Sequence, residues 1–229
     1  MKLFTPPAAT KDQLGKRWTI FILGMFLMGT GIALSIKGGI GVSPMSSVTN
    51  LLYKIFPGIS LGTFSFLVNF LFFVAEFAVA PKTWHPSKIL TQLGPTFICS
   101  LFIDMNMALV GGLNPQSYGA KLVTLLAGCI VFGLSLALMV SADAALQPSE
   151  AFISVVADRT GKEWGNVRTV VDISMVVVAV VVSLIVFHGL TTVREGTVIG
   201  AVLIGQSSRW FAPLTDRIFV PRKRMATAQ

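Results

Sequence analysis

Two short segments, about a hundred residues apart, combine a proline with polar side chains inside an otherwise apolar chain. The first reads SPMSS at residues 43–47, and the second reads QPSE at residues 147–150. Serine is a good N-cap and proline is favourable at the first helical position, so each segment predicts the start of a helix. The free N–H groups of a helix start attract anions. The carboxylate of the second segment could instead hold a proton, Na⁺ or the amine of a ligand.

Ionisable side chains also occur in the apolar stretches around these segments. Asp143 lies in the polar break before the second proline, and Arg168 and Asp172 are four residues apart. Residues with that spacing share one face of a helix and can form an ion pair. A charge inside a membrane is costly and is a candidate functional group. A structural ion pair, a capped helix start or an interfacial charge would account for the same residues.

These observations define a candidate site for a solute and a driving ion. The predicted substrate-binding residues are Ser43, Ser46, Ser47, Asn69, Gln147, Ser149, Arg168 and Arg194. The predicted residues for coupling to a proton or cation are Asp143, Glu150, Asp172 and Glu195. The sequence contains no His/Cys cluster, no phosphate-binding loop and no serine with a recognisable base. We therefore expect no catalytic residue, no metal, no cofactor and no enzymatic activity.

The composition is that of an integral membrane protein. Of 229 residues, 53% are hydrophobic and only 12% are charged, whereas a soluble domain carries about 25% charged residues. Mean hydropathy is +0.76. The net charge of +8 comes from Lys and Arg between the apolar stretches and in the two tails. This distribution sets membrane topology and does not indicate a nucleic-acid partner.

Six apolar stretches are long enough to cross a hydrocarbon core of about 30 Å, which takes roughly 20 residues. They cover residues 18–36, 60–80, 89–109, 120–141, 166–188 and 195–214. Two shorter helices are predicted at 44–56 and 148–160. At about 1.5 Å per residue each is about 20 Å long, too short to cross unaided. We expect both to be half-membrane, or re-entrant, helices. An arrangement with eight crossings stays open.

Counting basic residues in the loops places both termini in the cytoplasm with either six or eight crossings. The four tryptophans favour six. Trp18, Trp84, Trp164 and Trp210 all lie at the cytoplasmic interface with six crossings, and Trp84 changes sides with eight.

The two halves of the chain echo one another. With Pro44 placed on Pro148, the glycines and the Ala-Leu pairs of residues 29–54 fall on those of residues 133–158. Each half has three crossings and one short helix. Because three is odd, the second half enters from the opposite face, which predicts inverted repeats. The expected organisation is a tail at 1–17, repeats at 18–110 and 120–214, and a basic tail at 215–229.

Several short motifs occur in a specific order. They are GVSP at 41–44, the Arg168-Thr169 pair with Asp172 three residues later, and VREGTV at 193–198 followed by LIG at 203–205. In this order they resemble the YczE/YyaS/YitT family of bacterial membrane proteins, over about residues 18–211. A Gly-Pro-Arg-Asp-like tetrapeptide often opens the second short helix in that family. Here it is QPSE, which keeps the acid and lacks the arginine. The resemblance implies a multi-pass protein of the bacterial cytoplasmic (inner) membrane, loosely described as a transporter.

Taken together, the sequence predicts an all-α membrane transporter, either a secondary carrier or a facilitator. A small polar or anionic metabolite would bind near the midplane between the starts of the two short helices. H⁺ or Na⁺ would drive transport, and one half would rock against the other. A channel is an alternative, as is a non-transporting partner that assists a membrane-associated enzyme or assembly. The lipid bilayer is the expected partner, and a homodimer stays open.

Overall fold

The protein is built from helices, as the sequence predicts. The computed structural model describes residues 14–81, 89–189 and 191–219, and contains no strand among them. The predicted tails, the loop with Trp84 and the basic residues 222–224 lie wholly or partly outside these residues. The helices are α1 (Leu14–Gly38), α2 (Pro44–Ile55), α3 (Leu61–Val79), the π-helical turn η3 (Ile89–Leu93), α5 (Gly94–Leu109), α6 (Tyr118–Ala142), α7 (Pro148–Thr160), α8 (Trp164–Phe187) and α9 (Glu195–Phe219).

Four helices, α1, α3, α6 and α8, are long and apolar enough to cross a membrane by length and composition. The other two predicted crossings correspond to α9 and to η3 followed by α5. α5 has 16 residues, and the apolar sequence of α9 is interrupted by the polar residues 206–209 and contains Pro213, although the helix itself is continuous. Large apolar side chains are exposed along α3 and α8. Such surfaces suit lipid, so the chain is a helical membrane protein.

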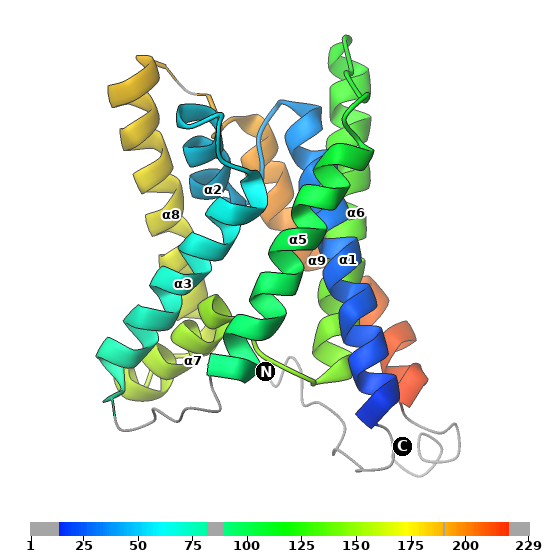
Figure 1. The fold of residues 1–229 in the computed structure, drawn as a ribbon, viewed down its shortest axis with the longest axis vertical. Coiled ribbons are helices and arrows are strands. Elements are labelled where there is room, and N and C mark those ends of the chain that lie inside the picture. Colours follow the sequence, from blue (N-terminus) through cyan, green and yellow to red (C-terminus); the bar gives the residue numbers. More distant parts are fainter. Residues whose placement is uncertain (1–13, 82–88, 190, 220–229) are drawn as a thin grey trace.

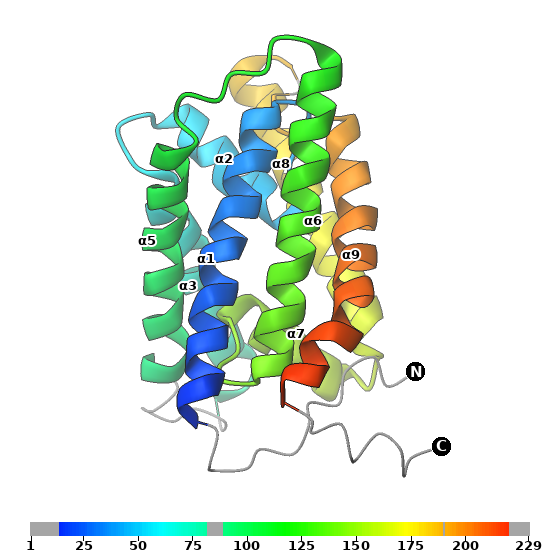
Figure 2. The ribbon, with the colours of Figure 1, turned by 90° about the vertical axis from the view of Figure 1, so that its right-hand side faces the viewer.

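Helices α5, α1, α6 and α9 lie side by side in that order and form what we call the layer (Figure 2). Small residues let these helices approach closely, as is common in membranes. A Cβ atom added to Gly29 would lie 3.0 Å from the backbone of Phe102 on α5. One added to Gly133 would lie 2.3 Å from Cβ of Ser207 on α9. Gly29 and Gly133 are the two glycines that the internal echo aligns, and they make equivalent contacts.

The other four helices, α2, α3, α7 and α8, form a second group that we call the ring. Within it, α2 contacts α3 and α8, and α7 contacts α3 and α8. The ring stands beside the layer, with α2 in its upper half and α7 in its lower half (Figure 1). Each short helix therefore packs on a long helix from the other half of the sequence, so the two halves interlock.

The chain runs in opposite directions through corresponding helices of the two halves. It ascends in α1 and α5 and descends in α3, whereas it descends in α6 and α9 and ascends in α8 (Figure 1). The start of α1 and the end of α9 lie at the same, lower end of the molecule.

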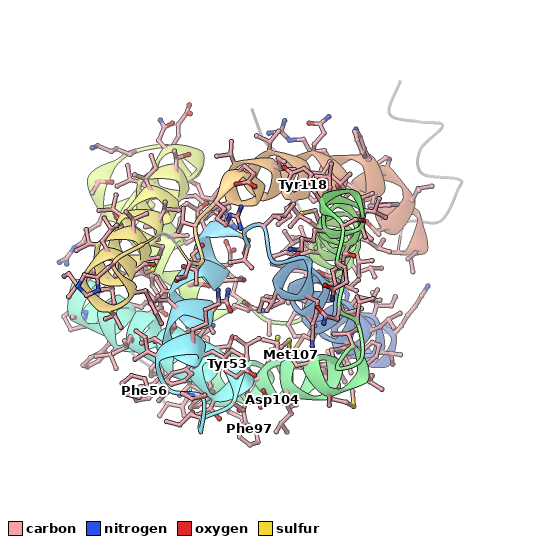
Figure 3. All side chains as sticks on the ribbon, turned by 90° about the horizontal axis from the view of Figure 1, so that it is seen from above. Tyr53, Phe56, Phe97, Asp104, Met107 and Tyr118 are labelled. Atoms are coloured by element: carbon pink, nitrogen blue, oxygen red, sulfur yellow. The ribbon has the colours of Figure 1, made fainter. Side chains whose placement is uncertain are left out.

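Hydrogen bonds join α3 of the ring to α5 of the layer. The hydroxyl of Ser60 donates to Oδ2 of Asp104 at 2.6 Å, and the N–H of Gly62 donates to Oδ1 at 2.7 Å. A carboxylate at a helix start is favourable, because it meets the unpaired N–H groups there. Seen from above, Asp104 lies on α5 near the end of α2, where Tyr53 and Phe56 are (Figure 3).

Each short helix is also tied at its far end to the other half of the chain. The amine of Lys54, in the last turn of α2, donates to the carbonyl of Thr191 at 2.7 Å. The guanidinium of Arg159, in the last turn of α7, donates to the carbonyl of Val79, the last residue of α3. We call these two contacts the latches. Burial and the nearby charge of Arg194 lower the pKa of Lys54 from its ordinary value of 10.5.

Candidate functional site

A cavity of about 70 Å³ lies between the layer and the ring. The two walls differ in chemistry. The layer contributes only apolar side chains, which are Met28, Ile32, Ile103, Phe132 and Leu136. The helices of the ring contribute the polar ones, which are Ser46, Thr49, Ser65, Asn69, Ser149, Glu150 and Arg168, and Gln147 adds another from the break before α7. The cavity is therefore amphipathic, with its charged groups on one side.

The cavity brings together half of the residues singled out from the sequence. These are Ser46, Asn69, Gln147, Ser149, Glu150 and Arg168. They come from α2, α3, the start of α7 and α8, which are far apart in the chain. The structure thus places parts of both proline segments at one cavity.

The two charged residues of this wall, Glu150 and Arg168, form an ion cluster with Asp172, which does not itself line the cavity. Nη1 of Arg168 lies 2.5 Å from Oε1 of Glu150, and Nε of Arg168 lies 3.7 Å from Oδ2 of Asp172. The guanidinium also lies over the ring of Trp164, 5.2 Å from its centroid. The predicted pair within α8 is present, but Glu150 on α7 is the closer partner. Two carboxylates and one guanidinium leave the cluster with one net negative charge when all three are ionised.

Asn69 presents an unused acceptor. Its Nδ2 donates to the carbonyl of Ser65 at 3.0 Å, which fixes the orientation of the amide, because a flipped amide would set two oxygens against each other. Oδ1 is buried and accepts no hydrogen bond from the described residues. A buried acceptor without a donor costs about 1–3 kcal/mol. A donor from a bound molecule would recover that cost.

Ser43 and Ser47 lie at the start of α2 and serve the helix itself. Ser43 is the N-cap and accepts a hydrogen bond from the N–H of Ser46 at 3.3 Å, as predicted. The hydroxyl of Ser47 donates to the carbonyl of Ser43 at 3.0 Å. Both are buried, and neither lines the cavity.

Three other predicted residues lie away from the cavity. Asp143 ends α6 in a left-handed conformation, with φ of 45°, and lies 3.7 Å from the guanidinium of Arg17. That guanidinium is buried and donates to the carbonyl of Ala142 at 3.3 Å. Asp143 therefore belongs to the contact between α1 and α6. Arg194 and Glu195 pair with each other at 3.4 Å, and each side chain is 45% exposed.

Thr49, Ser65 and Arg17 were missed by reasoning from sequence. Thr49 follows Ser46 by three residues and Ser65 precedes Asn69 by four, so each shares a helix face with a predicted residue. That spacing is a signal that could have found them. Arg17 was assigned to the N-terminal tail, yet α1 begins at Leu14 and includes it.

Other classes of site find little support in the described part of the chain. No group of three or more His, Cys, Asp and Glu side chains there could hold a metal ion. Cys99 and Cys129 are buried and free.

Comparison with known proteins agrees with the resemblance read from the motifs. "Uncharacterized membrane protein YczE" of Bacillus subtilis (strain 168) is 24% identical over 205 residues, which are 89% of this chain and 88% of that protein. "Uncharacterized protein YyaS" of the same organism is 24% identical over 210 residues, 91% of this chain and 98% of that protein. No solved structure matches the chain significantly. YczE and YyaS are thus relatives of this chain, and because the profile of the "Family of unknown function (DUF6198)" matches residues 15–213, this chain belongs to that family.

Proposed function

We propose that the protein is a transporter of a small polar solute, which passes through the cavity between the layer and the ring. The observation that carries the proposal is the pair formed by Glu150 and Arg168 on the wall of that cavity. Ionisable groups inside membrane proteins mark substrate and ion pathways, because their burial is otherwise too costly to keep. The protein would reside in the bacterial cytoplasmic membrane with both termini inside.

The proposed topology has six crossings in two inverted repeats, α1–α5 and α6–α9. Its support is the opposite direction of corresponding helices, the reciprocal packing of α2 on α8 and of α7 on α3, and the equivalent contacts of Gly29 and Gly133. The short helices α2 and α7 have 12 and 13 residues. At about 1.5 Å per residue they fall short of a 30 Å core, which disfavours eight crossings.

The moving parts would be the layer and the ring. The sequence suggested that one half rocks against the other. The interlocked halves argue against that motion, because separating them would break the contacts of both short helices with the opposite half. Movement of the ring against the layer keeps these contacts. It would open the cavity alternately toward the two faces, since the cavity lies at that boundary.

Coupling to a driving ion would run through the ion cluster. Protonation of Glu150 removes the charge that Arg168 contacts at 2.5 Å and leaves Asp172, at 3.7 Å, as its remaining acidic partner. A proton taken up from one face would thus change the charge of the cavity wall. Asp143 and Glu195 lie outside the cavity and have no part in this proposal.

The test is transport by purified protein in liposomes with an imposed pH gradient. We expect saturable uptake of at least one solute from a panel of polar metabolites, and loss of uptake on adding an uncoupler. Glu150→Gln should abolish the gradient-driven component. Glu195→Gln, in the exposed pair outside the cavity, is the matched control and should behave as wild type.

Two results would overturn the proposal that the protein is a carrier. Uptake that neither saturates nor responds to the uncoupler would indicate a channel. Absence of uptake across the panel, together with unchanged metabolite levels in a deletion strain, would indicate a non-transporting membrane protein.

A further inference from the structure

We infer that the cavity binds a small organic cation: an ammonium or guanidinium group on a short apolar body. The inference names the substrate class of the proposed transporter and in that sense rests on the proposed function.

The first reason is the charge of the ion cluster. Arg168 is the only cation on the cavity wall among the described residues, and it already contacts Glu150 and lies near Asp172. An anionic solute would add a third negative charge around one guanidinium. A cationic solute would bring the cluster to neutrality, which is the favourable state for charges held away from water.

The second reason is the free acceptor of Asn69. Its Nδ2 is committed to the carbonyl of Ser65, so the group that the amide can offer a ligand is the buried Oδ1. An ammonium has three donors and no acceptor, and a guanidinium has only donors. Either group satisfies Oδ1. An ionised carboxylate offers acceptors alone and leaves Oδ1 unpaired.

The third reason is the opposite wall. The layer side of the cavity is formed by Met28, Ile32, Ile103, Phe132 and Leu136, with no polar side chain among them. This wall would bury the body of the solute by the hydrophobic effect. The volume of about 70 Å³ holds about five water-sized groups at roughly 15 Å³ each. The apolar body is therefore only a few carbon atoms long.

The experiment uses three probes of similar size and different charge: n-butylammonium, butyrate and n-butanol. Each is titrated into purified full-length protein in detergent at constant ionic strength, and binding is followed by thermal shift and calorimetry. We expect saturable binding of n-butylammonium, with a Kd on the order of 1 mM for so few atoms. Butyrate and n-butanol should bind at least tenfold more weakly.

Variants locate the probe in the cavity. Asn69→Leu should weaken n-butylammonium binding about tenfold or more, because a hydrogen bond to a charged group is lost. Asn69→Asp keeps an acceptor and adds a negative charge, so it should strengthen binding of this probe and weaken binding of butyrate. This variant keeps the inference testable if Asn69→Leu fails to fold. Glu195→Gln is the control and should leave the Kd unchanged.

The outcomes separate the substrate class from the transport function. The inference of a cationic solute is overturned if butyrate binds in place of n-butylammonium, or if Asn69→Asp binds n-butylammonium more weakly than wild type. Neither result contradicts the proposed transport function. If none of the three probes binds at a concentration tenfold above the expected Kd, the inference that the solute is a cation is also overturned. Binding of n-butylammonium that responds to both Asn69 variants supports the inference, even where the liposome assay finds no uptake and so refutes transport.

Discussion

The contact between Glu150 and Arg168 should stabilise the fold measurably, because it joins α7 to α8 at a cavity wall. Removing one partner of a fully buried pair costs about 3–5 kcal/mol. Two features reduce that figure for Glu150→Gln. The side chains of Arg168 and Glu150 are 30% and 27% exposed, and Asp172 stays within 3.7 Å of the guanidinium. We expect a loss of about 1–2 kcal/mol.

Removing the arginine of this pair should lower stability more than removing the carboxylate. Arg168→Gln removes the cation that both Glu150 and Asp172 contact, and we expect a loss of stability of about 2–4 kcal/mol. The double variant removes the pair together. Its loss should be smaller than the sum of the single losses, with a coupling free energy of about 1–3 kcal/mol.

The assay is a double-mutant cycle on purified protein, with unfolding followed by circular dichroism on heating and in denaturant. For a chain of this length, 1 kcal/mol corresponds to a shift in Tm of about 2–4 °C. The matched control is the same cycle on Arg194 and Glu195, whose side chains are each 45% exposed. An exposed pair should show a coupling of about 0–0.5 kcal/mol. Losses for Glu150 and Arg168 that add within about 0.5 kcal/mol would refute the reasoning.

Three further predictions follow from packing, titration and topology. Gly133→Ala should lower stability by about 1–3 kcal/mol through the clash with α9, whereas Gly205→Ala, whose added Cβ meets nothing within 4 Å, should leave the Tm unchanged or raise it, because alanine favours the helix over glycine. Burial lowers the pKa of Lys54 below 10.5, which means that the positive charge of its amine destabilises the folded state. This destabilisation disappears as pH rises toward 10.5 and the amine loses its proton in both states. The stability of wild type relative to Lys54→Met should therefore increase as pH rises toward 10.5, and a difference that does not change with pH would contradict a lowered pKa of Lys54. With six crossings, a membrane-impermeant maleimide added to intact cells should label Gly58→Cys and not Lys162→Cys. Labelling of neither would favour eight crossings.

The helices were predictable because their existence depends on local information. Apolar length marked the long helices, and the serine and proline at 43–44 marked the start of α2, which the structure confirms. The ends were less exact, since α1 begins at Leu14 and so takes in Arg17. A polar residue near the end of an apolar stretch does not reveal whether the helix includes it.

The site was only partly predictable because its contacts cross between helices. The spacing of Arg168 and Asp172 predicts a pair within one helix, and that pair exists. Nothing in the spacing shows that Glu150, on another helix, lies closer. Asp143 shows the opposite failure. It lies in a polar break as expected, but the left-handed turn at the end of α6 sets it beside Arg17 and away from the cavity.

The two latches have a consequence for how the halves of this chain can evolve. In both, a side-chain cation bonds to a main-chain carbonyl, at Thr191 and at Val79. The acceptor exists whatever residue occupies that position. A substitution at either acceptor position therefore needs no matching change at Lys54 or Arg159. These contacts would not be visible as correlated substitutions in an alignment. The two halves can therefore diverge in sequence while both latches are retained.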